Sequence, residues 1–251
     1  MRAVILAAGR GQRLMPYTTS KPKCLVAVLG KPIVQWQIDL LLDHGIEQVT
    51  VVTGYGAEQV EEALHERYGE TVNTVFNPFH RLCDNLISAW MARPVLQGGC
   101  LLLNGDTLMD DGAMDAVLSG REGPVALAVH RKPVYDDDDM KVQLQGERLV
   151  HVGKRLSDPI DAESIGCIRF DESGARWFCG ILEDAVHDET ALGQWYLSVI
   201  DRMAAQHPVW VQDIGHNRWA EVDCPADLAH LREVLPRWSL HSQGVALCDA
   251  E

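Results

Sequence analysis

Short apolar runs alternate with amphipathic segments through the first half of the chain. Continuous stretches of Val, Ile and Leu that end at turn residues indicate buried strands, and apolar positions three and four residues apart indicate helices. The pattern predicts strands over 3–6, 49–53, 72–76 and 100–104, and helices over 33–41, 57–68 and 86–91. Strands that alternate with helices are typical of βαβ units, so we expect a mostly parallel sheet with helices on its faces.

The pattern changes after Gly120, where short strands follow one another more closely. Strands over 140–144 and 148–152 flank Gly146 and predict a β-hairpin. The remaining predicted elements are strands over 125–129, 165–170 and 209–212, and helices over 175–186, 191–206 and 226–235. We interpret residues 1–238 as a single domain with parts of about 1–120 and 121–238, and residues 239–251 as a tail or dimer arm.

The net charge of the chain excludes some classes of binding partner. The 251 residues carry 22 Lys and Arg against 36 Asp and Glu, a formal net charge of −14. Nucleic acids and anionic membranes bind basic surfaces, so this charge argues against both. No apolar run approaches the roughly 20 residues that span a bilayer, and Arg10 and Arg13 follow the first apolar run too soon for a signal peptide. The seven cysteines form no Cys-x-x-Cys pair, which favours reduced thiols in a cytoplasmic protein.

The first strand leads into a loop that is rich in glycine and in basic residues. Gly9 and Gly11 let the backbone bend so that N–H groups can approach phosphate oxygens. Arg13 and Lys23 bring two positive charges to the same neighbourhood, Arg as a planar fork and Lys as a point charge. An ordinary turn with solvated basic residues is the alternative, but the combination favours a cradle for a polyphosphate. A dinucleotide-binding dehydrogenase is disfavoured, because the third glycine of that fingerprint is missing.

Two acidic segments are candidates for a metal site. Asp106 follows the apolar run 100–104, and ligands of open α/β sheets bind at the carboxyl ends of the strands. An aspartate there can hold Mg²⁺, which takes only one or two protein carboxylates, although a solvated turn is the alternative. Glu221 and Asp223 alternate and would share one face of a strand. Asp223 could instead be the N-cap of the helix that follows it.

The run from Leu6 to Leu14, followed by Lys21-Pro22-Lys23, resembles the signature of the NTP-transferase (nucleotidyltransferase) superfamily. Asp106 and Asp223 occur in the order that this superfamily shows, so the resemblance extends to about residue 235. It implies an α/β fold with a Rossmann-like core of the GT-A type. In that fold a mixed, mostly parallel central sheet is flanked by helices, and a small portion made of a β-hairpin and helices binds the acceptor.

The same resemblance implies roles for individual residues. Asp106 and Asp223 would hold Mg²⁺, and Lys23 would lie near the reacting phosphoryl groups together with Arg13. Arg13 would also wrap the triphosphate with Gly9 and Gly11. Residues implied to bind the nucleotide are Leu6, Ala7, Ala8, Gly9, Gly11, Asn85, Ser88 and Asp106, with Ala7 and Ala8 under the base and ribose.

One segment favours a particular branch of the superfamily. Members that act on sugar 1-phosphates usually carry a Glu-x-Gly-Gly-like segment before the metal-binding strand. This chain instead has an Asn-x-x-Ser helix start at Asn85 and Ser88, which is similar to cytidylyltransferases that act on phosphocholine, inositol phosphate or phosphonates. The segments 139–142 and 153–154 resemble that branch too. Asn85 and Ser88 could read a base edge or the ribose, whereas Asp84 or Asn85 could equally be a helix N-cap.

The acceptor is less well determined. Lys141 and Lys154 are candidates to meet its phosphate, and ordinary exposed lysines are the alternative. Trp195, together with Tyr196 and Trp219, could box a quaternary ammonium group by cation–π contact, although aromatic residues are more often core. The remaining candidates are Glu163, which the resemblance places near a polyol, and the acidic run 136–139, which could meet a cationic head group or be a solvated loop.

The sequence therefore predicts a Mg²⁺-dependent cytidylyltransferase that transfers CMP from CTP to a phosphorylated small alcohol or a phosphonate and releases pyrophosphate. A phosphate monoester is already largely dianionic at neutral pH, so no general base is required. The alternatives are a sugar-1-phosphate nucleotidyltransferase that uses UTP, dTTP or GTP, and a non-catalytic nucleotide-sensing subunit. We expect CTP and a phosphorylated small molecule as partners, with no nucleic acid and no membrane, and a homodimer stays possible.

Overall fold

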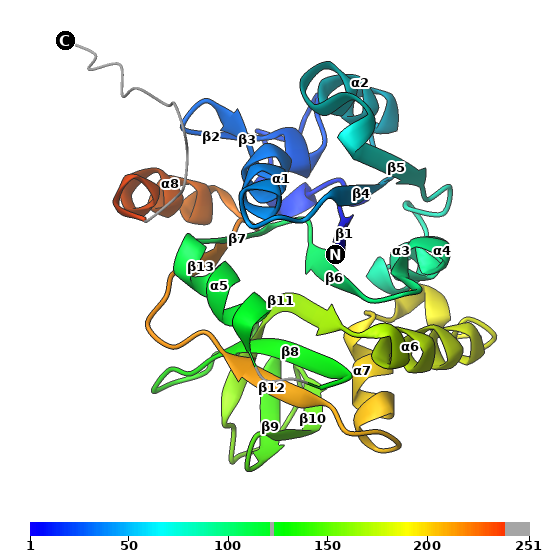
Figure 1. Ribbon diagram of the computed structural model, residues 1–251. Helices are drawn as coiled ribbons and strands as arrows, with labels where there is room; N and C mark the ends of the chain where they lie inside the picture. The colour runs from blue at the N-terminus through cyan, green and yellow to red at the C-terminus, as the bar shows by residue number, and fades with distance from the viewer. Residues whose placement is uncertain (121–122, 239–251) are drawn as a thin grey trace.

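A computed structural model describes residues 1–120 and 123–238, and the predicted tail 239–251 lies outside the described residues. In the described residues a nine-stranded sheet forms the centre of the molecule (Figure 1). Its strands run in the order β5 (Val72–Phe76), β4 (Gln48–Thr53), β1 (Arg2–Leu6), β6 (Cys100–Asn104), β11 (Ala162–Phe170), β8 (Val125–His130), β12 (Trp210–Asp213), β10 (Arg148–Gly153) and β9 (Lys141–Gln145). One sheet therefore runs through both predicted parts of the chain.

The sheet is mixed, and the expectation of a mostly parallel sheet is wrong for its second half. Strands β5, β4, β1 and β6 are parallel, as the βαβ pattern predicts. Beyond them β11 runs antiparallel to both β6 and β8, and β9 and β10 form the predicted antiparallel hairpin. Only β8 and β12 restore a parallel pair. The difference arises because short connections such as the turn at Gly146 reverse the chain directly, whereas parallel neighbours need a crossover.

Helices cover both faces of the sheet because alternate residues of its strands point to opposite sides. One face packs against α1 (Ile33–Asp43), α2 (Ala57–Tyr68) and α5 (Asp111–Ser119). The other face packs against α3 (Asn85–Met91), α4 (Arg93–Leu96), α6 (Glu172–Ala185) and α7 (Leu197–Ala204). In β1, for example, Ile5 belongs to the first layer and Val4 to the second. The pattern of apolar residues did not predict α5, whose first turn is capped by the Asp110 side chain.

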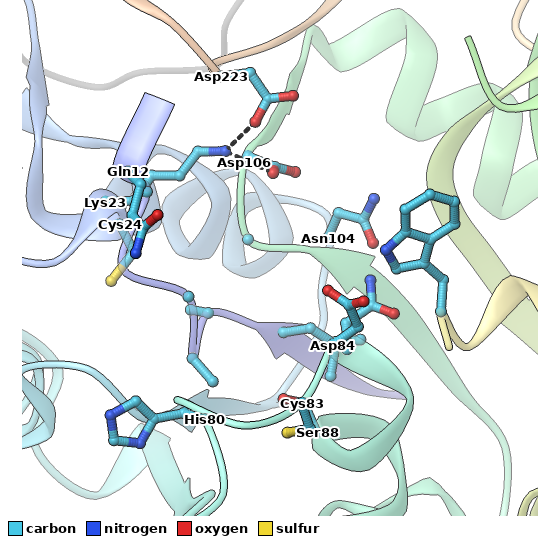
Figure 2. Close-up of a pocket in the computed structure, with 18 of the residues that line it drawn as sticks. Gln12, Lys23, Cys24, His80, Cys83, Asp84, Ser88, Asn104, Asp106 and Asp223 are labelled. Carbon is cyan, nitrogen blue, oxygen red and sulfur yellow. Dashed lines mark hydrogen bonds and ion pairs between the residues drawn. The ribbon is translucent and has the colours of Figure 1, made fainter. Parts of the chain in front are cut away.

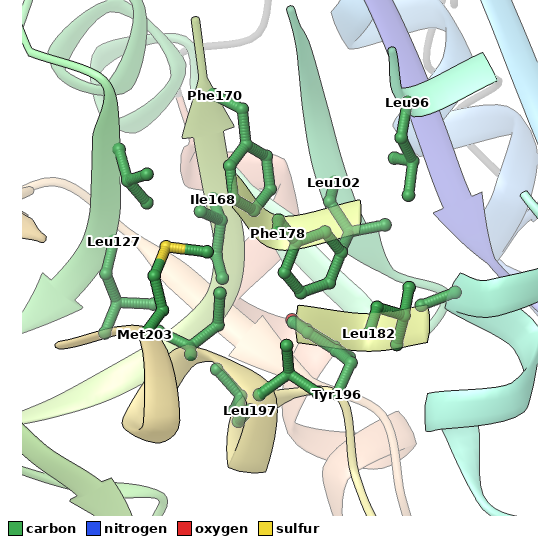
Figure 3. Packing of buried hydrophobic residues seen from close by; sticks show 14 of the residues in the cluster. Leu96, Leu102, Leu127, Ile168, Phe170, Phe178, Leu182, Tyr196, Leu197 and Met203 are labelled. Atoms are coloured by element: carbon green, nitrogen blue, oxygen red, sulfur yellow. The ribbon is translucent and has the colours of Figure 1, made fainter. Parts of the chain in front are cut away.

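The second layer contains the largest fully buried side chains among the described residues, Tyr196, Phe170 and Phe178 (Figure 3). Phe170 of β11 and Phe178 of α6 stack with their ring centroids 4.9 Å apart. Leu182 of α6 and Met203 of α7 are fully buried beside them. Such close packing fixes α6 and α7 on the sheet and so fixes the segment that connects them.

A smaller unit attaches the end of the described chain to the centre of the sheet. Strand β7 (Thr107–Met109) pairs antiparallel with β13 (Trp219–Glu221), and α8 (Pro225–Val234) follows. A third apolar cluster packs α8 against the short strand β2 (Ala27–Val28), which pairs with β3 (Lys31–Pro32). Val222 N–H then donates to the carbonyl of Asp106 at 3.1 Å. Residues that are far apart in the chain thereby meet at the end of β6.

The predicted helix over 191–206 is interrupted. A short 3-10 turn covers Ala191–Gly193, and α7 begins only at Leu197. Backbone groups of this region bond to the start of α3 instead. The carbonyl of Leu192, in the 3-10 turn, accepts from Asp84 N–H at 2.7 Å, and Tyr196 N–H, just before α7, donates to the side chain of Asn85 at 2.9 Å. A continuous helix would use these groups internally, so the tertiary contact replaces it. Among the described helices, none is long and apolar enough to cross a membrane.

Candidate active site

A cavity of about 400 Å³ opens at the ends of β1 and β6 (Figure 2). Its lining includes twelve of the residues that the sequence singles out: Leu6, Ala7, Ala8, Gly9, Gly11, Arg13, Lys23, Asn85, Ser88, Asp106, Trp195 and Asp223. Strands β1 and β6 pair in register with Leu6 opposite Asn104, so the loops that follow them are neighbours. This pairing brings the glycine-rich loop and the Asp106 turn to one edge of the sheet.

Two glycines permit the close approach of these loops. Gly105 N–H donates to the carbonyl of Leu6 at 3.0 Å, and a Cβ at position 105 would lie 2.5 Å from that oxygen. Gly11 has a φ of +75°, and a Cβ there would lie 2.7 Å from the Cβ of Lys23. Any side chain at either position would force the backbone to move. The loop therefore packs directly against Lys23.

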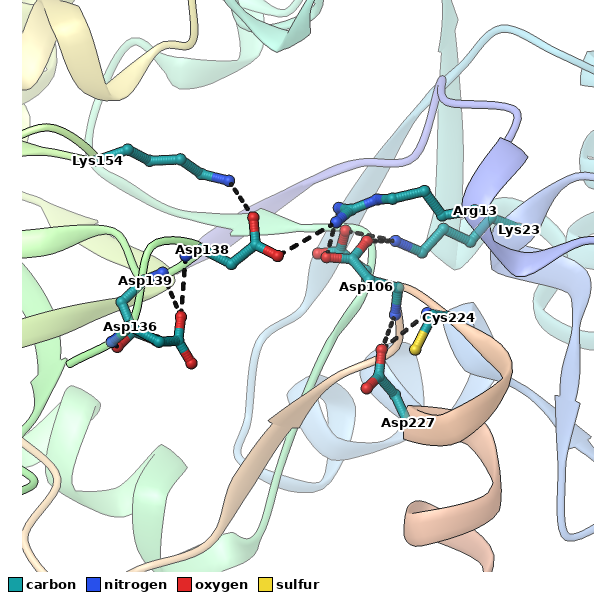
Figure 4. A network of polar contacts seen from close by, with 10 residues as sticks. Arg13, Lys23, Asp106, Asp136, Asp138, Asp139, Lys154, Cys224 and Asp227 are labelled. Carbon is teal, nitrogen blue, oxygen red and sulfur yellow. Dashed lines mark hydrogen bonds and ion pairs between the residues drawn. The ribbon is translucent and has the colours of Figure 1, made fainter. Parts of the chain in front are cut away.

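Lys23 lies between two carboxylates at the centre of the site (Figure 4). Its Nζ is 2.8 Å from Asp106 Oδ2 and 2.6 Å from Asp223 Oδ1. Arg13 Nη2 is 2.8 Å from the other oxygen of Asp223. Burial alone would lower the pKa of Lys23, but the negative charges of Asp106 and Asp223 outweigh burial and raise the pKa. Lys23 is therefore a permanent cation in this site.

Asp223 is free for this role because another residue caps α8. The N-cap is Cys224, and the Asp227 carboxylate accepts from the backbone N–H groups of Asp223 and Cys224 at 2.8 and 2.7 Å. The alternative interpretation of Asp223 as the N-cap is thus wrong. Burial would raise the pKa of Asp223, but Lys23 and Arg13 outweigh burial and lower it. The Asp223 side chain is therefore ionised and turned toward the cavity.

The carboxylates at this point suit a hard divalent cation. Asp106 Oδ1 is buried and has no hydrogen-bond partner among the residues that the structure describes. Burial, reinforced by the charges of Asp106 and Asp223, raises the pKa of nearby Glu221 to about 8. Within the described residues no group of three or more His, Cys, Asp and Glu side chains could hold a metal. Mg²⁺ needs fewer protein ligands, because it keeps water and takes phosphate oxygens.

Asn85 and Ser88 of α3 line the same cavity. Asp84 is the N-cap residue of this helix, as one alternative predicted, but its side chain makes no capping hydrogen bond within the described residues. Asn85 is the first helical residue, so the N-cap interpretation is wrong for Asn85. Asn85 Oδ1 instead accepts from Tyr196 N–H at 2.9 Å. Ser88 Oγ accepts from Asn77 Nδ2 at 3.0 Å. Both side chains are held by the fold rather than by their own helix.

An adjoining cavity of about 260 Å³ shares six lining residues with the first one: Arg13, Asn85, Asn104, Asp106, Trp195 and Asp223. The other residues of its lining that the sequence singles out are Asp136, Asp138, Asp139, Lys154, Glu163, Trp219 and Glu221. Carboxylates outnumber cations in this lining, so we call it the acidic cavity. The charged centre around Lys23 therefore lies where two cavities meet.

Some side chains of the acidic cavity are already engaged by other residues. Glu163 is buried, and its carboxylate oxygens lie 2.7 Å from Lys132 Nζ and 3.1 Å from His130 Nδ1. Lys154 Nζ is 3.2 Å from Asp138 and 5.1 Å from the centroid of the Trp195 ring. Glu163 thus forms a fixed wall of the cavity, whereas Lys154 is near its surface.

Two predicted residues lie elsewhere. Lys141 lines neither of these cavities, and its Nζ donates to the backbone carbonyls of Asp136 and Lys154. Lys141 therefore holds the backbone at the acidic run 136–139 and does not point into either cavity where an acceptor phosphate could bind. Tyr196 is fully buried and forms no part of an aromatic box. Only Trp195 and Trp219 of the three aromatic candidates line the acidic cavity.

Asn77 and Asn104 were not singled out from the sequence, and Asp138 was considered only as part of the acidic run 136–139. Asn104 lines both cavities, and Asp138 lies between Lys154 and Arg13 (Figure 4). Asn77 and Asn104 each stand at or just after the carboxyl end of a parallel strand, which is the signal that could have found them. Asp138 carries no comparable signal, because its place depends on how the loop after β8 folds back.

The fold and this edge-of-sheet site define a nucleotidyltransferase. The nucleotidyl transferase family model matches residues 2–134, so the chain belongs to that family. The choline-phosphate cytidylyltransferase of Streptococcus pneumoniae is 41% identical over 94% of this chain and 98% of that protein. The CMP-5'-(3-aminopropyl)phosphonate synthase of Streptomyces rubellomurinus is 28% identical over 90% of this chain, which spans only 37% of that longer protein.

Solved structures agree with the fold. The inositol-1-phosphate CTP transferase of T. maritima superposes with a TM-score of 0.80 at 24% identity. The match covers 94% of this chain and 95% of that one. The resemblance predicted from the opening loop and from the Asn85 segment is therefore confirmed at the level of the family and its most similar types of enzyme.

Proposed function

We propose that this nucleotidyltransferase is a Mg²⁺-dependent cytidylyltransferase that transfers CMP from CTP to a phosphorylated small alcohol or a phosphonate. The observation that carries the proposal is the meeting of two cavities at Lys23, Arg13, Asp106 and Asp223. One cavity holds the glycine-rich loop that suits a triphosphate, and the other offers space for a second, anionic substrate. The cations at the junction would face the reacting phosphoryl groups of both.

The reaction needs little covalent chemistry from the protein. An oxygen of the acceptor phosphate or phosphonate attacks the α-phosphorus of CTP, a new P–O bond forms, and the bond to the β-phosphate breaks to release pyrophosphate. The acceptor oxygen is already anionic near neutral pH, so no side chain has to remove a proton. The contribution of Arg13 and Lys23 is to position both substrates and to stabilise the charge that develops in the transition state.

Asp106 and Asp223 are the residues that would hold Mg²⁺. Their carboxylate oxygens match its preference for oxygen ligands, and the unpartnered Oδ1 of Asp106 supports a missing ligand of that kind. When bound, the ion would neutralise charge on the triphosphate. Lys23 would then exchange part of its contact with the two aspartates for contact with phosphate.

The acidic cavity favours an acceptor that carries a cationic group as well as a phosphate or phosphonate. Asp136, Asp138 and Glu221 line it with few cations, and the indole rings of Trp195 and Trp219 add faces that attract cations. Phosphocholine and aminoalkylphosphonates have this character, and two of the relatives are named for such compounds. Inositol phosphate is the weaker candidate on this charge argument, because its polyol part carries no positive charge.

Pyrophosphate release measures the proposed reaction directly. Each NTP is paired with phosphocholine, 2-aminoethylphosphonate, inositol 1-phosphate and glucose 1-phosphate, with Mg²⁺ and with the metal chelated. We expect release with CTP and a cationic acceptor, and none after chelation. Release confined to glucose 1-phosphate with UTP, dTTP or GTP would contradict the proposal and favour the sugar-phosphate alternative. Tight nucleotide binding without any release would favour the nucleotide sensor.

A further inference from the structure

We propose that Asn77 is a positioning residue that makes the Ser88 hydroxyl a hydrogen-bond donor to the pyrimidine base and so selects CTP over UTP. The inference deepens the proposed function and rests on it. The cavity of about 400 Å³ at the ends of β1 and β6 is the proposed nucleotide cavity. Ser88 lines this cavity, whereas Asn77 does not and is fully buried behind Ser88. Its effect on the nucleotide would therefore be transmitted through Ser88.

The orientation of the Asn77 side chain is determined by a backbone group. Phe79 N–H donates to Asn77 Oδ1 at 2.9 Å. A backbone N–H can only donate, so the atom facing it must be the amide oxygen. The amide nitrogen then faces the other way, 3.0 Å from Ser88 Oγ and 3.5 Å from Cys83 Sγ. The two N–H hydrogens of the amide are both used in these contacts.

This arrangement determines what Ser88 can offer. Its oxygen accepts from Asn77, so its single hydrogen is free to donate in another direction. Within the described part of the chain no side-chain or backbone acceptor takes that hydrogen, and Ser88 lines the cavity. The hydroxyl is therefore a donor toward a bound nucleotide.

Asn85, one turn earlier on α3, also has a hydrogen-bond donor left for the cavity. Tyr196 N–H donates to Asn85 Oδ1, so the amide nitrogen of Asn85 is the group left for the cavity. Residues three apart on a helix lie on one face. The face of α3 in the cavity thus presents donors from both Asn85 and Ser88.

A donor face discriminates between the two pyrimidines. On the ring edge that pairs in nucleic acids, cytosine has acceptors at N3 and O2, whereas uracil has an N–H donor at N3. A donor that meets N3 is satisfied by cytosine and faces another donor in uracil, which leaves two polar groups unpaired. Sites built to hydrogen-bond a particular group reject an analogue that lacks it much more strongly than apolar pockets do.

Asn77→Asp replaces the donor that faces Ser88 by an acceptor, with almost no change in the shape of the side chain. The new carboxylate keeps an oxygen for Phe79 N–H and turns a second oxygen toward Ser88, whose hydrogen then points away from the cavity. We measure kcat/KM for CTP and UTP with a fixed acceptor. The ratio of CTP to UTP is expected to fall at least 10-fold. Asn73→Asp is the matched control, because Asn73 is an exposed residue of β5, and its ratio is expected to stay at the wild-type value.

Ser88→Ala tests the inference independently of any folding defect at position 77. It removes the donor, so the ratio should fall in the same direction, and Asn77→Asp should change it little further in the double variant. A 3-deaza-CTP analogue, which lacks the N3 acceptor, should lose rate against CTP in the wild type but not in Ser88→Ala.

The outcomes separate this inference from the proposed function. An unchanged CTP to UTP ratio in Ser88→Ala, or an equal loss with both nucleotides in folded Asn77→Asp, would overturn the role of Asn77 while the cytidylyltransferase activity stands. No reaction of the wild-type protein with CTP and any acceptor would overturn both.

Discussion

At the scale of single residues, the site is a set of opposite charges that hold one another in place. Lys23 is bound by Asp106 and Asp223, and the latter is bound by Arg13 as well. The side chain of Lys23 is only 13% exposed, so its charge acts in a poorly screened environment. Removing it would leave two carboxylates beside each other without their shared cation, at the place where the proposed reaction puts an anionic substrate.

We expect Lys23→Ala to lower the turnover number by about 100-fold or more, because loss of a charge-stabilising donor commonly has that effect. Lys21→Ala is the matched control, since Lys21 is exposed and lines neither cavity, and its turnover should stay near wild type. Pyrophosphate release under saturating CTP measures both. Near-normal turnover in Lys23→Ala, with the fold verified by circular dichroism, would remove Lys23 from the proposed mechanism.

At the scale of elements, helices α1 and α2 are joined by a polar contact outside the site. Asp39 of α1 is bound by Tyr68 at 2.6 Å and by Arg67 at 2.9 Å, both from α2, and by Lys31 at 2.5 Å. Burial alone would raise the pKa of Asp39, but the hydrogen bonds from these partners outweigh it and lower the pKa. The contact therefore stabilises the folded state through an ionised carboxylate.

The lowered pKa predicts how this contact depends on pH. Its contribution is fully present above the unfolded pKa of about 4 and is lost as the pH falls through the lower folded value. Asp39→Asn should lower the free energy of unfolding by about 1–2 kcal/mol at pH 6, and the difference from wild type should shrink as the pH falls below about 4. Urea unfolding across this range measures it.

Asp43→Asn on the same helix is the control, and it should change stability little at any of these pH values. A difference between wild type and Asp39→Asn that persists undiminished at the acid end would mean that the lost contact is not ionic.

At the scale of the molecule, the sheet unites both parts of the chain around one edge. The hydrogen bonds of Lys23 join residues that are 83 and 200 positions apart. The proposed nucleotide cavity is lined by residues at or near β1, α3, β6 and Trp195, which come from both predicted parts of the chain. A ligand that binds there contacts the whole fold, so its binding should stabilise the molecule as a unit.

We expect CTP with Mg²⁺ at 100 times its dissociation constant to stabilise the protein by about 2.7 kcal/mol. For a chain of this size that corresponds to a rise in the melting temperature of about 5–10 °C. Differential scanning fluorimetry with CTP, UTP, ATP and GTP at equal concentration measures it. The purine nucleotides should give smaller shifts, and shifts as large as that with CTP would contradict a pyrimidine-selective cavity.

Much of the architecture follows from local pattern. Strands β1, β4, β5 and β6 and the β9–β10 hairpin correspond to the apolar runs, because burial of alternate or continuous apolar residues is a local signal. The two-residue strands β2 and β3 do not correspond to predicted strands. The interrupted helix over 191–206 does not, since its backbone bonds to α3. The direction of β11 is also non-local: the sequence shows a strand but not its neighbours.

The family could be predicted from the residues alone, and the glycine-rich loop and the two aspartates could be singled out, because those features lie in short motifs whose residue types carry the chemistry. The folded structure was needed to show that Lys23 lies between the aspartates, that Lys141 bonds to the backbone of a loop, and that Tyr196 belongs to the core. Each of these depends on contacts between distant segments. A side chain's type limits what it can bind, but its neighbours in space determine which of those options it uses.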